Sequence, residues 1–183
     1  MIPPPAELIP LLELPAARAF DRIAVIPAQD LVPRPHVRGL CAADRCGEYG
    51  RHHLCPPAVG TLAQCAARLQ AFHHAVLVQQ GYAVEVADRP AAEATKRDLH
   101  ERVLALETAA RAALWPGAWA LMAGSCNLCS PCTIVHGKAC PYPGSARPSL
   151  ESMGVDVIAL VGPLGWPTAF RTDRIDWVGA LLV

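Results

Sequence analysis

Eight cysteines in two groups are the residues of this sequence whose type and spacing indicate chemistry. The second group lies in the stretch CNLCSPCTIVHGKACPYP. It places Cys126, Cys129 and Cys132 at successive three-residue steps and ends in Cys140, which a proline follows. Thiolates at C-x2-C-x2-C spacing followed by C-P are typical of loops that hold iron–sulfur clusters, although the ferredoxin run has a shorter final gap.

The main alternative for this loop is a structural zinc site, because zinc also takes four cysteines in a tetrahedron. Zinc sites usually present two separate C-x2-C pairs, whereas three cysteines at consecutive steps favour a cluster of several irons. We therefore expect a [4Fe–4S] cluster at the second group, with backbone N–H groups of the loop donating to its sulfur ligands.

The first group, CAADRCGEYGRHHLCPP, gives a weaker signal. Cys41, Cys46 and Cys55 are separated by four and eight residues, and prolines follow Cys55. Cys65 is the fourth candidate, since it falls in the first turn of an expected helix, where the helix dipole favours a thiolate. Cys65 also shares a helical face with apolar residues, which is typical of a buried free cysteine.

These spacings fit three arrangements. Each group holds its own cluster with four cysteines, or the C-P cysteine of each group crosses to the other cluster. In the third arrangement, the first site has only three cysteines and one open iron. The expected ligands of the metal or cofactor are Cys41, Cys46, Cys55, Cys65, Cys126, Cys129, Cys132 and Cys140.

The pattern of apolar residues predicts one α/β or α+β domain over residues 1–183, in which helices flank a mixed sheet and both cysteine loops lie at one end. Residues 1–20 are a proline-rich N-terminal segment. The clearest expected helix covers 91–114, and a capping box at Thr61 starts another, over 61–72. A short helix is expected over 148–154. A strand that enters a loop is expected over 21–32. Further strands are expected over 74–86 (one strand, or a hairpin turning at Gly81), 118–124, 155–162 and 174–183.

Composition excludes several classes of function. The net charge is zero, which argues against a nucleic-acid or anionic membrane surface as partner. No apolar run reaches the roughly 20 residues needed to cross a bilayer. The first residues carry no basic leader, so we expect a cytoplasmic protein. In that reducing compartment, clustered cysteines indicate metal binding more than disulfides.

Three stretches together resemble a known family: the two cysteine groups and ARPSLESMGVDV (Ala146–Val157). The family is domain of unknown function 2284, described as predicted metal-binding proteins, and the resemblance runs from Val37 to Val161. It implies metal or iron–sulfur binding by all the cysteines above except Cys65. It implies no particular reaction.

Other polar residues near the cysteines have simpler explanations. We expect His52, His53 and His136 to be solvated or hydrogen-bonded more than to bind metal. Arg51 and Arg147 either offset the negative charge of a cluster or form surface ion pairs.

We therefore expect an iron–sulfur protein with two [4Fe–4S] clusters that acts in electron transfer or in a reductive redox reaction. Its partner would be a redox protein or a small-molecule substrate. The sequence names no catalytic residue and no oligomeric state, and it leaves open whether the protein is an enzyme or an enzyme's electron donor. The alternative is a zinc-stabilised binding module in which both four-cysteine sites are structural.

Overall fold

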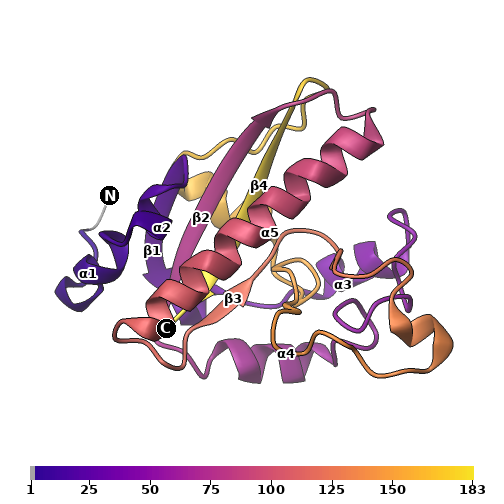
Figure 1. Cartoon of the computed structure of the whole chain (residues 1–183), viewed down its shortest axis with the longest axis horizontal. Coiled ribbons are helices and arrows are strands. Elements are labelled where there is room, and N and C mark those ends of the chain that lie inside the picture. The colour runs from indigo at the N-terminus through magenta and orange to yellow at the C-terminus, as the bar shows by residue number, and fades with distance from the viewer. Residues whose placement is uncertain (1–2) are drawn as a thin grey trace.

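A four-stranded antiparallel sheet with helices on both faces forms the centre of the protein (Figure 1). The computed structural model describes residues 3–183. The strand order is β1-β2-β4-β3. The strands are β1 (Arg22–Pro27), β2 (His74–Ala83), β3 (Trp119–Leu121) and β4 (Arg174–Leu182). The helices are η1 (Ala6–Leu8), α1 (Ile9–Leu12), α2 (Pro15–Arg18), η2 (Ala28–Asp30), α3 (Pro35–Ala42), α4 (Leu62–Leu69), α5 (Arg89–Ala112), η3 (Thr133–His136), α6 (Val157–Val161) and η4 (Gly162–Leu164).

The sheet separates two apolar layers, because successive side chains of a strand point to opposite faces. On β2, Val76 and Val78 pack with α5 and the N-terminal helices. Ala75 and Leu77 pack on the opposite face with α4 and α6. The fold is thus α+β, and the sheet that was expected to be mixed is antiparallel in all of its strand pairs.

Helix α5 covers one face of the sheet, as its 3.6-residue apolar period predicts. Leu99, Val103 and Leu106 are fully buried there. Gly179 on β4 allows this close packing, since a Cβ there would lie 3.1 Å from Cγ2 of Val103. The helix begins after Asp88, whose side chain accepts a hydrogen bond from the Ala91 N–H.

The other face is covered by α4, by the turn over 149–154 and by α6. The capping box at the start of α4 is confirmed: the Thr61 hydroxyl accepts from the Gln64 N–H, and the Gln64 side chain accepts from the Thr61 N–H. Leu69 of α4 is fully buried against the sheet.

The strand expected over 155–162 is wrong, because this segment forms α6. The Asp156 carboxylate accepts a hydrogen bond from the Ala159 N–H at 2.9 Å and caps the helix. Val157, Leu160 and Val161 pack on the core at helical spacing. The valine and isoleucine content of the segment had suggested a strand. The N-cap at Asp156 and the packing of one face on the core favour a helix instead.

Two further expectations need correction. Of the two possibilities for 74–86, the strand is present and the hairpin is not, since Gly81 pairs with Asp176 inside β2. A Cβ at Gly81 would collide with the Arg174 guanidinium. The helix expected over 148–154 is a series of turns that ends at Gly154, whose φ is +91°.

Candidate metal centre

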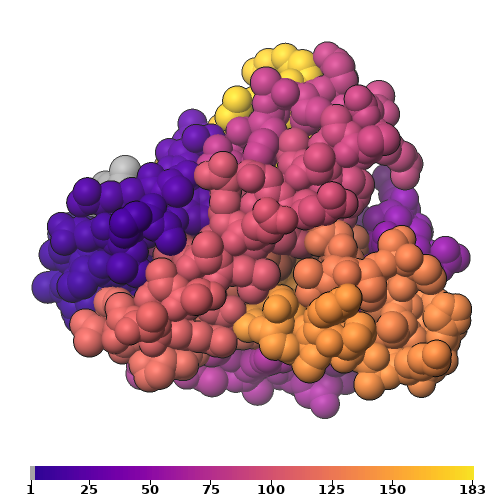
Figure 2. All heavy atoms as spheres, in the orientation of Figure 1, coloured from indigo at the N-terminus to yellow at the C-terminus, as the bar shows by residue number. Residues whose placement is uncertain are grey.

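Both cysteine loops lie at the same end of the molecule, beside α3 and η3 (Figure 1). The first loop covers residues 43–61 and follows α3, and the second covers residues 122–147 and follows β3. In Figure 2 the second loop, in orange, forms the surface of this end, and violet atoms of the first loop lie at its edge. All eight cysteines are free thiols.

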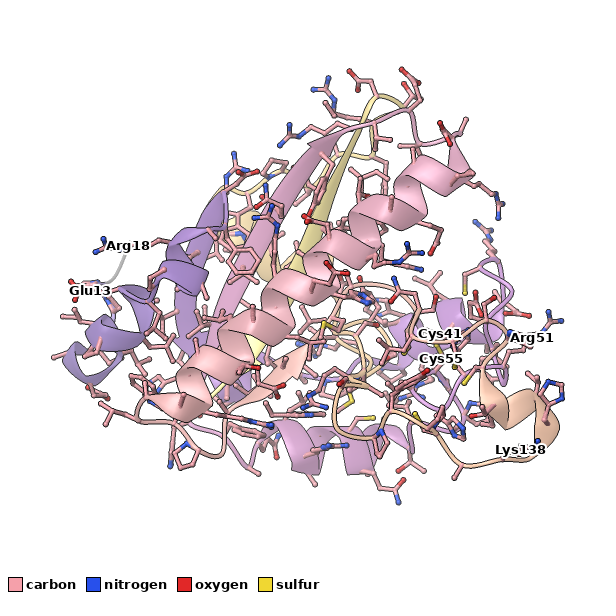
Figure 3. All side chains as sticks on the ribbon, in the orientation of Figure 1. Glu13, Arg18, Cys41, Arg51, Cys55 and Lys138 are labelled. Atoms are coloured by element: carbon pink, nitrogen blue, oxygen red, sulfur yellow. The ribbon has the colours of Figure 1, made fainter. Side chains whose placement is uncertain are left out.

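Cys41, Cys46 and Cys55 line one cavity of about 130 Å³. Cys41 belongs to the last turn of α3, and Cys55 is buried. In Figure 3 the labelled Cys41 and Cys55 lie next to one another, while Arg51 lies farther out. The cavity far exceeds the roughly 10–15 Å³ that a single water molecule needs. Its other lining residues are Glu48, Tyr49, Pro56, Gly124, Ser125, Ser149, Glu151 and Ser152.

The backbone of the first loop is held in a compact form that brings these three cysteines together. Asp44, with φ of 50°, accepts a hydrogen bond from the Tyr49 N–H at 2.8 Å. Gly47 and Gly50 also have positive φ, a conformation that glycine adopts without strain. The Gly50 N–H donates to the Pro56 carbonyl at 2.8 Å and closes the loop.

Burial raises the pKa of the Cys41 and Cys55 thiols, that of Cys55 to about 12. The charges of Cys46 and Glu48 raise the Cys55 pKa further. These two thiols are therefore protonated at neutral pH until a cation binds. Because metals bind thiolates, metal binding must release these protons, and metal affinity must rise with pH.

The second loop brings its four cysteines within electrostatic reach of one another. Burial raises the pKa of Cys126, and the charges of Cys129, Cys140 and Cys132 raise it further. The pKa of Cys129 is raised in the same way, first by burial and then by Cys132 and Cys140. Such mutual repulsion between thiolates is relieved when they share a cation.

Backbone N–H groups of this loop point at its sulfur atoms, as expected. The Tyr142 N–H donates to Sγ of Cys140 at 3.4 Å. Backbone N–H groups of Leu128 and Thr133 lower the pKa of Cys126 and Cys129, respectively, by hydrogen bonding to their sulfur atoms. Hydrogen bonds of this kind stabilise thiolate ligands and tune the potential of iron–sulfur clusters.

His53 joins the two loops. Its Nε2 donates to the Lys138 carbonyl at 3.0 Å and lies 3.2 Å from the Thr133 hydroxyl. The negative charge of Cys126 contributes to the raised pKa of Cys55, so the two sets of thiols are near neighbours. The histidine hydrogen-bonds as expected, and it links the two candidate sites.

Helix α5 fixes the start of the second loop. The His100 Nε2 donates to the Ala123 carbonyl at 2.8 Å, and Lys96 Nζ donates to the Ser125 hydroxyl at 3.3 Å. Gly124 between them has φ of +63°. Because Gly124 and Ser125 line the first cavity, the second loop also forms part of the wall of the first site.

The family model for predicted metal-binding proteins, DUF2284, matches residues 24–183. The chain belongs to this family. The match covers both cysteine loops and all four strands except the first two residues of β1. No curated protein and no solved structure matches the chain.

The DUF2284 description names metal binding without naming the metal. Within residues 3–183, no three His, Cys, Asp or Glu side chains are grouped closely enough to hold a single metal ion. None of the described helices has the length and hydropathy to cross a membrane.

Cys65 lies apart from the first cavity of this DUF2284 protein. It is 1% exposed and packs with Leu31 and Leu69 in the core layer beneath α4. Its Sγ accepts a hydrogen bond from Arg38 Nη2 at 3.5 Å. A role as ligand stays a prediction for Cys65, and this placement favours the alternative of a buried free cysteine.

We expect Cys65→Ser to leave the bound metal unchanged and to lower the free energy of unfolding by about 1–2 kcal/mol, because a hydroxyl replaces an apolar thiol in the core. Metal analysis and urea unfolding of the variant check both parts. A proportionate loss of metal would instead make Cys65 a ligand.

Arg147 does not face the thiols, because it forms a buried ion pair with Glu107 of α5. Its Nε and Nη2 donate to the two carboxylate oxygens at 2.9 and 2.8 Å. The Ala120 N–H donates to the same carboxylate at 3.0 Å. The expected ion pair of Arg147 is present, but its placement at the surface is wrong, because both side chains are buried. It anchors the chain between the second loop and the turn over 149–154.

Glu151, which was not expected at the site, also lines the first cavity. Burial raises its pKa, although the Ser149 hydroxyl and the backbone N–H groups of Glu151 and Gly124 oppose this. Glu151 belongs to no motif with regular spacing, and it lies about ninety residues after the first loop. The only available signal was its place inside the third stretch that resembles the family.

Proposed function

We propose that this protein is an iron–sulfur protein that binds two [4Fe–4S] clusters. Cys41, Cys46 and Cys55 would hold the first cluster. The second would be held by Cys126, Cys129, Cys132 and Cys140. The observation that carries the proposal is the convergence of the three first-loop cysteines on one cavity, beside a second loop whose N–H groups point at sulfur.

The residues present fit such a group in size and in donor chemistry. A single zinc ion is held by ligands about 2.3 Å away, which leaves no room around the ion. A cavity of about 130 Å³ suits a body of several atoms better. Thiolates are the ligands that iron–sulfur clusters use.

A bound cluster would supply one-electron transfer. The chain itself would hold the cluster, donate hydrogen bonds to its sulfur ligands and limit the access of water. Cys55 and Cys132 are buried, so the protein covers part of each site. Because His53 links the two loops, it would hold the two sites at a fixed separation, across which an electron could pass.

The first cavity has only three cysteines in its lining, which leaves one iron of a cluster there without a thiolate. An open iron favours a reductive reaction over simple electron carriage, because an electron carrier needs none. We therefore propose a small-molecule substrate at the first site and a redox protein that supplies electrons through the second. The free thiols support a reducing compartment such as the cytoplasm.

Metal and sulfide analysis of protein purified without oxygen tests this proposal. We expect a brown protein with about eight iron and eight acid-labile sulfide per chain, as two [4Fe–4S] clusters require. The absence of oxygen matters, because oxidised clusters fall apart and zinc can then occupy the thiolates. A colourless protein with stoichiometric zinc and no sulfide would establish the zinc-stabilised binding module instead.

A further inference from the structure

An unpaired carboxylate oxygen lies at the first site. Glu151 lines the same cavity as Cys41, Cys46 and Cys55. Its Oε2 is shielded from solvent and has no hydrogen-bond partner in the described structure. A buried polar atom without a partner costs free energy, so native proteins keep few of them, often at functional sites.

Several hydrogen bonds hold the turn that carries Glu151 and fix the position of this residue. The Ser149 N–H donates to the Ser152 hydroxyl, and the Ser152 N–H donates to the Ser149 hydroxyl, at 3.0 and 3.1 Å. The Gly154 carbonyl accepts from the Arg34 N–H at 2.7 Å. A Cβ at Gly154 would lie 2.7 Å from Leu62 Cδ2, so the backbone there is tightly packed.

The turn is also tied to the sheet. The Met122 N–H donates to the Pro148 carbonyl at 2.8 Å, and the Leu150 N–H donates to the Met122 carbonyl at 3.2 Å. These bonds extend β3 toward the cavity and hold Glu151 against it. The fold thus brings a residue from the third family stretch to the cysteines of the first.

The other carboxylate of the cavity is already engaged. Glu48 lines the cavity too, but its Oε2 pairs with Nε2 of His52. Three thiols and the side chain of Glu151, one oxygen of which has no partner, therefore lie in the wall of one cavity. A [4Fe–4S] cluster has four irons to ligate, and Cys41, Cys46 and Cys55 can serve only three of them.

We propose that Glu151 is the fourth ligand of the first site and binds, through Oε2, the iron that the three cysteines leave without a thiolate. This proposal rests on the proposed function. A carboxylate is a harder ligand than a thiolate and suits iron of a sulfide cluster less well. The carboxylate is thus the exchangeable ligand, and a small substrate with an oxygen or nitrogen donor atom would bind in its place.

The test uses oxidation of the complete protein, with both clusters loaded. An iron without a thiolate leaves a [4Fe–4S] cluster readily under ferricyanide, and the [3Fe–4S] product has its own EPR signal. We expect wild-type protein to form about one such product per chain and to lose about one of its eight irons. Glu151→Cys should form none. Glu151→Gln should lose its iron at least about tenfold faster than wild type, as loss of a metal partner usually costs that much affinity.

Glu13→Gln is the matched control, because it makes the same chemical change at a carboxylate that is paired with Arg18 outside the cavity. It should behave as wild type. Mössbauer spectra of protein loaded with ⁵⁷Fe give a second readout: one distinct iron per chain in wild type that becomes equivalent to the others in Glu151→Cys. Thermal unfolding of the metal-free variants checks that each one folds.

The outcomes separate this proposal from the proposed function. Protein with about eight irons whose Glu151→Gln and Glu151→Cys variants oxidise like wild type overturns the role of Glu151 alone. Protein that contains zinc and no sulfide overturns both proposals.

Discussion

Replacing Cys129 by serine is expected to remove about half of the iron and sulfide, from about eight to about four per chain. Cys129 belongs to the second loop, whose other thiolates cannot complete a cluster without it. The first site draws on different cysteines and should keep its cluster. Iron and sulfide analysis with EPR of the reduced protein measures the change.

Cys55→Ser provides the reciprocal measurement. It should remove the first cluster and leave the second, so that the EPR spectra of the two variants together account for that of wild type, except for any coupling between the clusters. If either variant loses all of its iron, the sites depend on each other, and the assignment of separate loops to separate clusters fails. A crossover of the C-P cysteines would give a different result: Cys55 would then belong to the second cluster, so Cys55→Ser and Cys129→Ser would remove the same cluster.

The second large effect concerns stability. Arg147→Ala is expected to lower the free energy of unfolding by at most roughly 3–5 kcal/mol, because it removes the bidentate partner of the buried Glu107 carboxylate and leaves only the partly exposed Arg111, 3.0 Å away, to compensate its charge. The side chains of this pair are only 5% and 3% exposed. Urea unfolding of metal-free protein, followed by circular dichroism, measures the loss.

Two further variants give this measurement its controls. Arg18→Ala removes an exposed pair with Glu13, labelled in Figure 3, and should cost less than about 1 kcal/mol. The double variant Arg147→Met with Glu107→Gln should recover part of the loss, since no uncompensated charge then remains buried. A loss from Arg147→Ala no larger than that from Arg18→Ala would contradict the buried-pair explanation.

Local patterns were enough to predict some elements. Helix α5 follows from the spacing of Leu99, Val103 and Leu106, and α4 follows from the capping box at Thr61. These signals lie within a few residues of one another, so no knowledge of the tertiary structure is needed to recognise them.

Features that depend on distant contacts could not be predicted. Gly81 left a strand and a hairpin both open, and it lies in a strand that pairs with β4, almost a hundred residues away in the sequence. The composition of Val157–Val161 suggested a strand. The segment is a helix because its core-facing residues lie on one side at helical spacing. In the site, the spacing of cysteines indicated the thiols, whereas Glu151 reaches the cavity only through its turn on β3.

The strand order has a consequence for how the protein is made. β3, which leads into the second cysteine loop, pairs with no named strand except β4 in the described sheet, and β4 is the last strand to be synthesised. While the ribosome is still producing residues 124–173, β3 therefore lacks its neighbour, and the loop after it lacks a fixed base. The fixed base of that loop therefore forms only after residues 174–182 have left the exit tunnel.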